Sequence, residues 1–160
     1  HPDELDDALT RLQPPAQMKG APDAARLLAD AVSHLVTVVL LVGSETVEGK
    51  TTAEGMRIVG YFEKGTDNKI GERAFYPNSQ QCYIEMRMKD AKRHGECYTF
   101  YQNGNKWSLN TYENGVLNGD YKTWYENGKL YVEGEYENGK EVGEWIFYNE
   151  DGTEKERKKY

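Results

Sequence analysis

The chain has 160 residues, which is room for one ordinary domain or for a small domain joined to a repeat array, and this length excludes a large two-lobed enzyme. Hydrophobic residues make up 38% of the chain and aromatic residues 12%, which favours a fold that stacks aromatic surfaces over one with a deep aliphatic core. The formal net charge is -7. Nucleic acids and anionic lipid headgroups would be repelled by this charge, so we expect no nucleic-acid partner and do not favour membrane contact.

The two cysteines, Cys82 and Cys97, are too few for a disulfide-stapled secreted scaffold. We place both on the same face of neighbouring strands and expect free buried thiols. A cytoplasmic protein is the expectation, and a processed secreted or periplasmic form stays open. The longest apolar run, residues 35–42, is far shorter than a bilayer span.

The first unit of the chain is predicted to be residues 1–55. Leucine and alanine recur there at helical spacing over residues 5–12 and 22–33, which predicts two short amphipathic helices. Residues 35–42 are rich in β-branched side chains, which favour a buried strand. The polar, glycine-punctuated stretch 44–55 is interpreted as a loop.

A second unit, residues 56–153, is predicted to begin with a strand over 56–62 and to continue as a repeat. Four glycines, each followed by an acidic residue, are spaced 24 residues apart: Gly71, Gly95, Gly119 and Gly143. Within this stretch the sequence Tyr-Gln-Asn-Gly or Tyr-Glu-Asn-Gly occurs four times. Asn-Gly between strand-like runs is the strongest local signal for a β-hairpin. The sequence therefore predicts a meander of about eight strands.

If Asn103-Gly104 and Asn127-Gly128 are two-residue turns, the register of each hairpin follows. Phe100 would then face Trp107, and Trp124 would face Tyr131. The next turn would place Tyr131 opposite Ile146. Alternation along the strands puts these aromatic residues on one face with Glu133 and Glu135. Two alternatives stay open: both faces are packed within the fold, or one is left free for binding.

The motif over residues 119–145, Gly-Asp-x-x-x-Trp-Tyr-Glu-Asn-Gly-Lys-Leu followed by Gly-x-Tyr-x-Asn-Gly-Lys and Gly-x-Trp, resembles the bacterial MORN-repeat variant. The resemblance covers about residues 71–152. It implies an elongated single-layer antiparallel sheet that contacts proteins or, for MORN repeats proper, lipids. Proteins of this kind are often labelled antitoxin-like or immunity-like, and the resemblance implies no catalytic residues.

Other motifs weigh little against this interpretation. Gly49-Lys50-Thr51 follows a hydrophobic run as in a phosphate-binding loop, but five residues separate Gly43 from Gly49 where that motif has four. No histidine lies in a zinc-ligand spacing, so we expect neither metal nor cofactor. Residues 154–160 alternate in charge and are interpreted as a frayed tail.

These observations predict an α+β chain: N-terminal helices and a hydrophobic strand, then a twisted antiparallel β-meander of 24-residue hairpin repeats. The predicted function is a non-catalytic protein-binding module of the antitoxin or immunity kind, with a toxin or another basic protein as partner. Its alternatives are a structural or membrane-proximal adaptor and, more remotely, a nucleotide-binding enzyme. The residues predicted to bind the partner are Phe100, Trp107, Trp124, Tyr131, Tyr148, Glu133 and Glu135.

Overall fold

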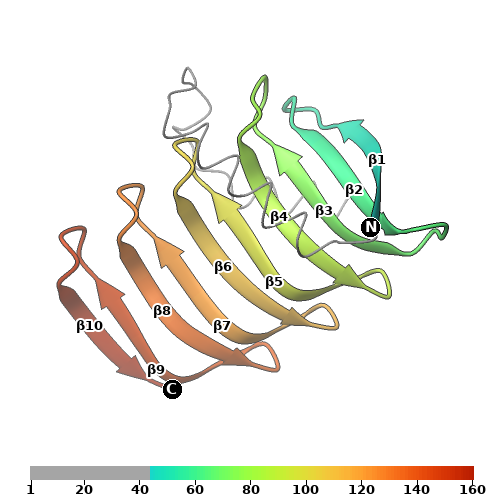
Figure 1. The fold of residues 1–160 in the computed structure, drawn as a ribbon. Coiled ribbons are helices and arrows are strands. Elements are labelled where there is room, and N and C mark those ends of the chain that lie inside the picture. The colour runs from blue at the N-terminus through green and yellow to red at the C-terminus, as the bar shows by residue number, and fades with distance from the viewer. Residues whose placement is uncertain (1–43) are drawn as a thin grey trace.

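The structure, a computed structural model, describes residues 44–160, so the helices and the strand predicted within residues 1–43 lie outside the described residues. The described part is one antiparallel sheet of ten strands in chain order, with β1 at one end and β10 at the other (Figure 1). The strands are β1 (Ser44–Thr51), β2 (Arg57–Glu63), β3 (Lys69–Phe75), β4 (Cys82–Lys89), β5 (Lys92–Phe100), β6 (Lys106–Glu113), β7 (Val116–Trp124), β8 (Leu130–Glu137), β9 (Lys140–Tyr148) and β10 (Glu154–Lys159). The predicted antiparallel meander is confirmed.

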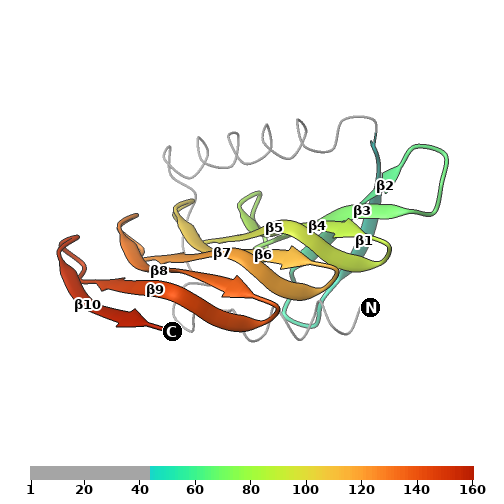
Figure 2. The same ribbon diagram turned by 90° about the horizontal axis from the view of Figure 1, so that it is seen from below.

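The ten strands form a single twisted layer (Figure 2). Strand β2 confirms the strand predicted over 56–62. Strands β1 and β10 were not predicted: the first replaces the expected loop within 44–55, and the second replaces the expected frayed tail at 154–160. Both are the outermost strands and have polar sequences. A polar or charged strand is tolerated at a sheet edge because it has a neighbour on one side only and does not have to be buried.

Two kinds of turn alternate along the array. Two-residue turns join β4 to β5, β6 to β7 and β8 to β9, and both residues of each have positive φ: Asp90-Ala91, Asn114-Gly115 and Asn138-Gly139. At the other end of the strands, the turns that join β5 to β6, β7 to β8 and β9 to β10 are longer. The backbone N–H of Tyr101 donates to the carbonyl of Asn105 at 2.9 Å, and that of Gly104 donates to the carbonyl of Tyr101 at 3.0 Å.

Tyr125, Gly128 and Lys129 repeat this pattern, as do Asn149, Gly152 and Thr153. Each of these turns therefore has three loop residues, the last a glycine with positive φ. One 24-residue repeat consists of two strands and one turn of each kind.

The three-residue turns shift the register, so the predicted cross-strand pairs are wrong by one residue. Phe100 pairs with Lys106, and Thr99 pairs with Ser108, which leaves Trp107 as the extra residue of a bulge. The next repeat behaves in the same way. There Trp124 pairs with Leu130, and Tyr131 is the extra residue.

The third predicted pair is also wrong. Ile146 pairs with Glu133, because the register shifts between Glu133 and Glu135. Three of the four repeat glycines lie at such shifts and have positive φ, namely Gly95, Gly119 and Gly143. Their periodicity marks bulges that only a residue without a Cβ adopts easily.

Cross-strand partners share a face of the sheet, so the register defines two faces. The Lys122 face is named for a row of partners running from β5 to β10: Tyr98, Leu109, Lys122, Glu133, Ile146 and Arg157. The Thr123 face carries the neighbouring row: Thr99, Ser108, Thr123, Val132, Phe147 and Glu156.

Buried side chains on both faces are concentrated in β2 to β6. The cluster on the Thr123 face comprises Met56, Ile58, Ala74, Tyr76, Tyr83, Ile84, Met86 and Cys97. The cluster on the Lys122 face comprises Val59, Tyr61, Phe75, Cys82 and Phe100. The two cysteines are free and buried, as expected, but they lie on opposite faces and not on one. Beyond Asn110, the buried residues among those described are Val132 and Trp145, so β7 to β10 leave parts of both faces open.

Candidate binding surface

A row of aromatic side chains crosses the Lys122 face at 24-residue spacing. Phe100, Trp124 and Tyr148 are the last residues of β5, β7 and β9, and each stands directly before a three-residue turn. Phe100 is buried, whereas Trp124 and Tyr148 are half-buried. The repeat thus presents one ring from each unit at the same height of the sheet, and the two C-terminal rings remain partly accessible.

A ladder of tyrosine hydroxyls fixes the backbone of this aromatic row. The hydroxyl of Tyr76 donates to the carbonyl of Phe100 at 2.6 Å, that of Tyr101 to Trp124 at 2.7 Å, and that of Tyr125 to Tyr148 at 2.7 Å. Burial raises the pKa of Tyr101 to about 12, so its hydroxyl stays protonated and able to donate. Each tyrosine ties one repeat to the next.

The asparagines of the three-residue turns form a second ladder beside the first. The Asn103 side-chain amide donates to the carbonyl of Glu126 at 2.9 Å, and that of Asn127 donates to the carbonyl of Glu150 at 3.0 Å. These asparagines therefore connect neighbouring turns in addition to shaping their own.

One lysine cation lies between rings of adjacent repeats. The Lys106 ammonium is 5.1 Å from the centre of the Tyr98 ring and 5.6 Å from that of Trp124. Cation–π contacts at exposed sites are worth about 0.5–1 kcal/mol each. Lys106 thereby links two units on this face.

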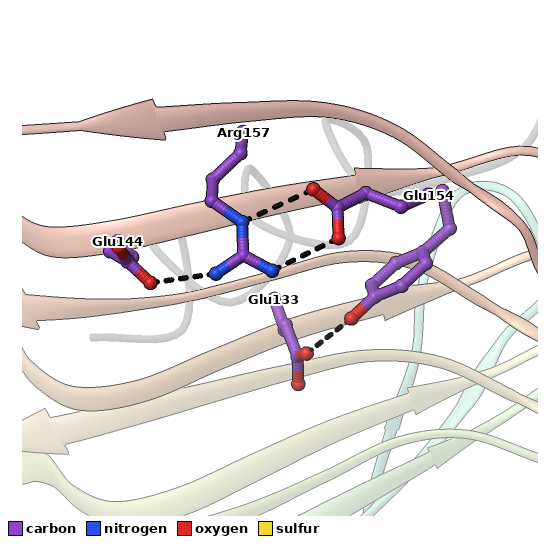
Figure 3. A network of polar contacts seen from close by, with 5 residues as sticks. Glu133, Glu144, Glu154 and Arg157 are labelled. Carbon is purple, nitrogen blue, oxygen red and sulfur yellow. Dashed lines mark hydrogen bonds and ion pairs between the residues drawn. The ribbon is translucent and has the colours of Figure 1, made fainter.

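The C-terminal end of the Lys122 face carries a charged network (Figure 3). The Arg157 guanidinium donates to Glu144 at 2.8 Å and to Glu154 at 2.9 Å. The Tyr148 hydroxyl donates to Glu133 at 2.6 Å, and this bond is the main reason that the pKa of Tyr148 is raised. Three carboxylates of this end are therefore already partnered within the chain.

Two other carboxylates on the same face lack a cation. Asp120 and Glu135 are direct cross-strand partners and both are exposed. Among the described residues, no ion pair joins either of them to a lysine or arginine. Like charges directly opposite each other destabilise a sheet. This pair leaves negative charge without an ion-pair partner on the face that carries the aromatic row.

The structure divides the predicted binding residues between the two faces. Phe100, Trp124, Tyr148, Glu133 and Glu135 share the Lys122 face, as predicted. Trp107 and Tyr131 do not join them: they are bulge residues that pack on the Thr123 face.

The ring contacts show this placement. Trp107 lies 6.3 Å from Tyr83 and 5.7 Å from Tyr101, and Tyr131 lies 4.9 Å from Tyr125, measured between ring centres. Side chains alternate between the two faces along a regular strand, but a bulge at each of these residues interrupts the alternation.

Sequence reasoning missed some contributors to the two surfaces. Lys106 and Arg157 were not proposed, although each lies among aromatic or acidic side chains of the Lys122 face. On the Thr123 face Tyr136 and Tyr160 were missed: their ring centres lie 5.1 and 6.0 Å from that of Trp145, which also packs against Tyr121 at 5.2 Å. Tyr136 and Tyr160 are 24 residues apart, and this repeat spacing is the signal that would have placed both on one face.

Other kinds of site find little support in residues 44–160. No group of three metal-binding side chains occurs there. This part of the chain also has no helix that is long and apolar enough to cross a membrane. Gly49, Lys50 and Thr51 belong to β1, whereas a phosphate-binding loop lies between a strand and a helix.

A single-layer array of β-hairpins repeated along one axis defines a repeat protein that presents a sheet surface. The MORN repeat variant family model matches residues 93–114 and 117–138, and this part of the chain consists of MORN repeat variants. Each matched unit is one hairpin around a three-residue turn, ending at the following two-residue turn.

Comparison with solved structures finds weak likenesses only. No curated protein matches the chain. Among solved structures, TarM is 16% identical with a TM-score of 0.44, and the match covers 99% of this chain and 31% of TarM. An S. aureus TarM mutant in complex with fondaparinux, alpha-GlcNAc-glycerol and UDP is 16% identical with a TM-score of 0.32, over 88% of this chain and 31% of the other. The chain spans about a third of the length of these proteins, and likenesses this weak say nothing about its function.

Proposed function

We propose that this chain is a non-catalytic protein-binding module that recognises a basic partner protein through the Lys122 face. The observation that carries the proposal is the aromatic row of Phe100, Trp124 and Tyr148, which the repeat sets at equal intervals on one face. Tryptophan and tyrosine are the usual anchors of protein interfaces.

Charge supports the choice of a basic partner. The chain has a net charge of -7, and Asp120 and Glu135 add negative charge without an ion-pair partner to the face that carries Trp124. A lysine or arginine of the partner placed between these two carboxylates would relieve their repulsion.

The test compares alanine variants of the two faces. Candidate basic proteins are mixed with the wild-type chain and with Trp124→Ala, Tyr148→Ala and Tyr131→Ala, and the dissociation constants are measured. Tyr131 is an exposed aromatic residue on the opposite face, so its variant is the matched control. We expect weaker binding for the first two variants only. Loss of binding with Tyr131→Ala alone would place the interface on the Thr123 face.

The finer role we propose is that of an antitoxin or immunity protein, which blocks a toxin by covering its surface. A rigid, single-layer sheet suits occlusion because its surface is already ordered before binding. The competing role is that of an adaptor in which the array is a spacer. In that case none of the three face variants would change partner binding, whereas an antitoxin would lose both binding and inhibition with Trp124→Ala.

A nucleotide-binding enzyme is the least supported alternative. The Gly49-Lys50-Thr51 segment lies within β1, where Thr51 pairs with Arg57 of β2. A strand of this kind does not present the run of free backbone N–H groups that holds phosphates. Thermal stabilisation by a nucleotide that is abolished by Lys50→Ala would revive it.

A further inference from the structure

The same pentapeptide occurs twice in the array in different structures. Tyr-Glu-Asn-Gly-Lys occupies residues 125–129 and residues 136–140. The first copy forms a three-residue turn, closed by hydrogen bonds between Tyr125 and Lys129. The second copy contains the two-residue turn Asn138-Gly139. The two Asn-Gly pairs thus have identical neighbours in sequence and different contacts in space.

The Asn127 side chain is held at both of its polar atoms. Its amide nitrogen donates to the carbonyl of Glu150 at 3.0 Å, and its side-chain oxygen accepts the backbone N–H of Lys129 at 2.9 Å. Asn103 in the preceding repeat is held in the same manner, by Glu126 and Asn105.

The Asn138 side chain is exposed, and no hydrogen bond restrains it among the described residues. Only its backbone is tied, through its N–H to the Asn118 side chain at 3.0 Å. Asn114 is alike: its backbone N–H reaches His94 at 3.2 Å, and its side chain is exposed and unrestrained within residues 44–160.

This difference matters for a reaction to which Asn-Gly sequences are prone. The backbone nitrogen of the glycine, having lost its proton to water or hydroxide, attacks the side-chain carbonyl carbon of the asparagine. A carbon–nitrogen bond forms, and the side-chain amide leaves as ammonia. Water then opens the resulting cyclic imide to aspartate or to isoaspartate. The attack requires the glycine N–H to be released and the asparagine side chain to swing toward the glycine nitrogen. The glycine N–H donates a backbone hydrogen bond at all four sites, so the sites differ in the side chain, and a side chain held at both ends cannot swing.

We propose that Asn138 and Asn114 are sites of spontaneous deamidation, and that the paired side-chain hydrogen bonds of Asn127 and Asn103 protect those residues. Both modified sites lie at the same end of the strands, in the two-residue turns that set the hairpin register. Isoaspartate lengthens the main chain of such a turn by one carbon. It also adds a negative charge next to Glu113 or Glu137.

The experiment follows the four sites in one sample of the full chain. The protein is incubated in a mildly alkaline buffer, its folding is checked by circular dichroism, and deamidation is quantified by peptide mapping with mass spectrometry. We expect Asn138 to be modified several-fold faster than Asn127, and Asn114 faster than Asn103.

A parallel incubation in urea provides the control. Because residues 125–129 and 136–140 have the same sequence, Asn127 and Asn138 should react at similar rates once the chain is unfolded. Similar rates for Asn127 and Asn138 in the native protein, or faster loss of Asn127, would overturn the proposal. A preference for Asn138 that persists in urea would overturn it as well, since the fold would not be its cause.

Discussion

The hydroxyl of Tyr101 donates a hydrogen bond to the backbone carbonyl of Trp124, 2.7 Å away in the next repeat. Its equivalents at Tyr76 and Tyr125 make the same bond to Phe100 and Tyr148. Each of these tyrosines stands at the start of a turn and fixes the backbone of an aromatic residue 23 or 24 positions further along the chain.

Removing this hydroxyl should weaken the array. For Tyr101→Phe we expect a loss of about 1 kcal/mol in the free energy of unfolding, the usual net value of one hydrogen bond, measured by urea denaturation. Tyr131→Phe is the control, because the Tyr131 hydroxyl makes no hydrogen bond among the described residues, and its stability should be unchanged. Equal losses in both variants would contradict the proposed role of the ladder.

The turn at Asp90-Ala91 should be improved by glycine. Ala91 has a φ of 61°, at the position where the equivalent turns contain Gly115 and Gly139. An alanine with left-handed backbone costs about 1 kcal/mol, so Ala91→Gly should raise the free energy of unfolding by roughly that amount. The reverse change, Gly115→Ala, should lower it similarly, because a Cβ there would meet Lys92 only at an ordinary contact distance of 3.8 Å. A neutral Ala91→Gly variant would argue against this turn geometry.

Gly134 is required by a different constraint, namely space. A Cβ at this position would lie 2.2 Å from the Trp145 ring. Gly134→Ala should therefore displace the ring and cost about 1–3 kcal/mol, with a change in tryptophan fluorescence. Gly143→Ala is the comparison, since nothing lies within 4 Å of its Cβ and only its φ of 68° is unfavourable. Unchanged fluorescence in Gly134→Ala would contradict the packing.

One acidic group of the last turn should titrate below its ordinary range. The hydroxyl and the backbone N–H of Thr153 both donate to Asp151, and they lower the pKa of its carboxyl from 3.8. A pKa lowered by folding means that the carboxylate stabilises the fold above its ordinary pKa, and that this contribution disappears as pH falls through the folded value. Carboxyl NMR should show a midpoint below 3.8 that rises in Thr153→Val. A midpoint that the substitution leaves in place would show that the hydroxyl is not the cause.

The sequence predicted the period, the antiparallel meander and the residues of the Lys122 face that lie in regular strand, among them Trp124 and Tyr148. It could not distinguish the two kinds of turn, because Tyr-Glu-Asn-Gly-Lys forms both. The contacts with the neighbouring repeat differ between the two copies, and they are absent from any local window. Trp107 and Tyr131 were assigned to the wrong face because each is the extra residue of a bulge, and the sequence does not show where a bulge lies.

The edge strands illustrate another limit. Residues 154–159 have a charged sequence typical of a solvated tail, yet they pair with β9. Arg157 contributes to that pairing by bonding Glu144 across the strands. Pairing of this kind depends on the presence of an open sheet edge, which the residues of β10 do not themselves encode.

The placement of Trp124 and Tyr131 on opposite faces decides which surface is available to a partner, and side-chain NOE measurements test it most directly. We expect cross-peaks from the Trp124 ring to the Lys106 side chain, and from the Tyr131 ring to that of Tyr125. Strong cross-peaks between the Trp124 and Tyr131 rings would show that they stand side by side, and would contradict the register and the binding face derived from it.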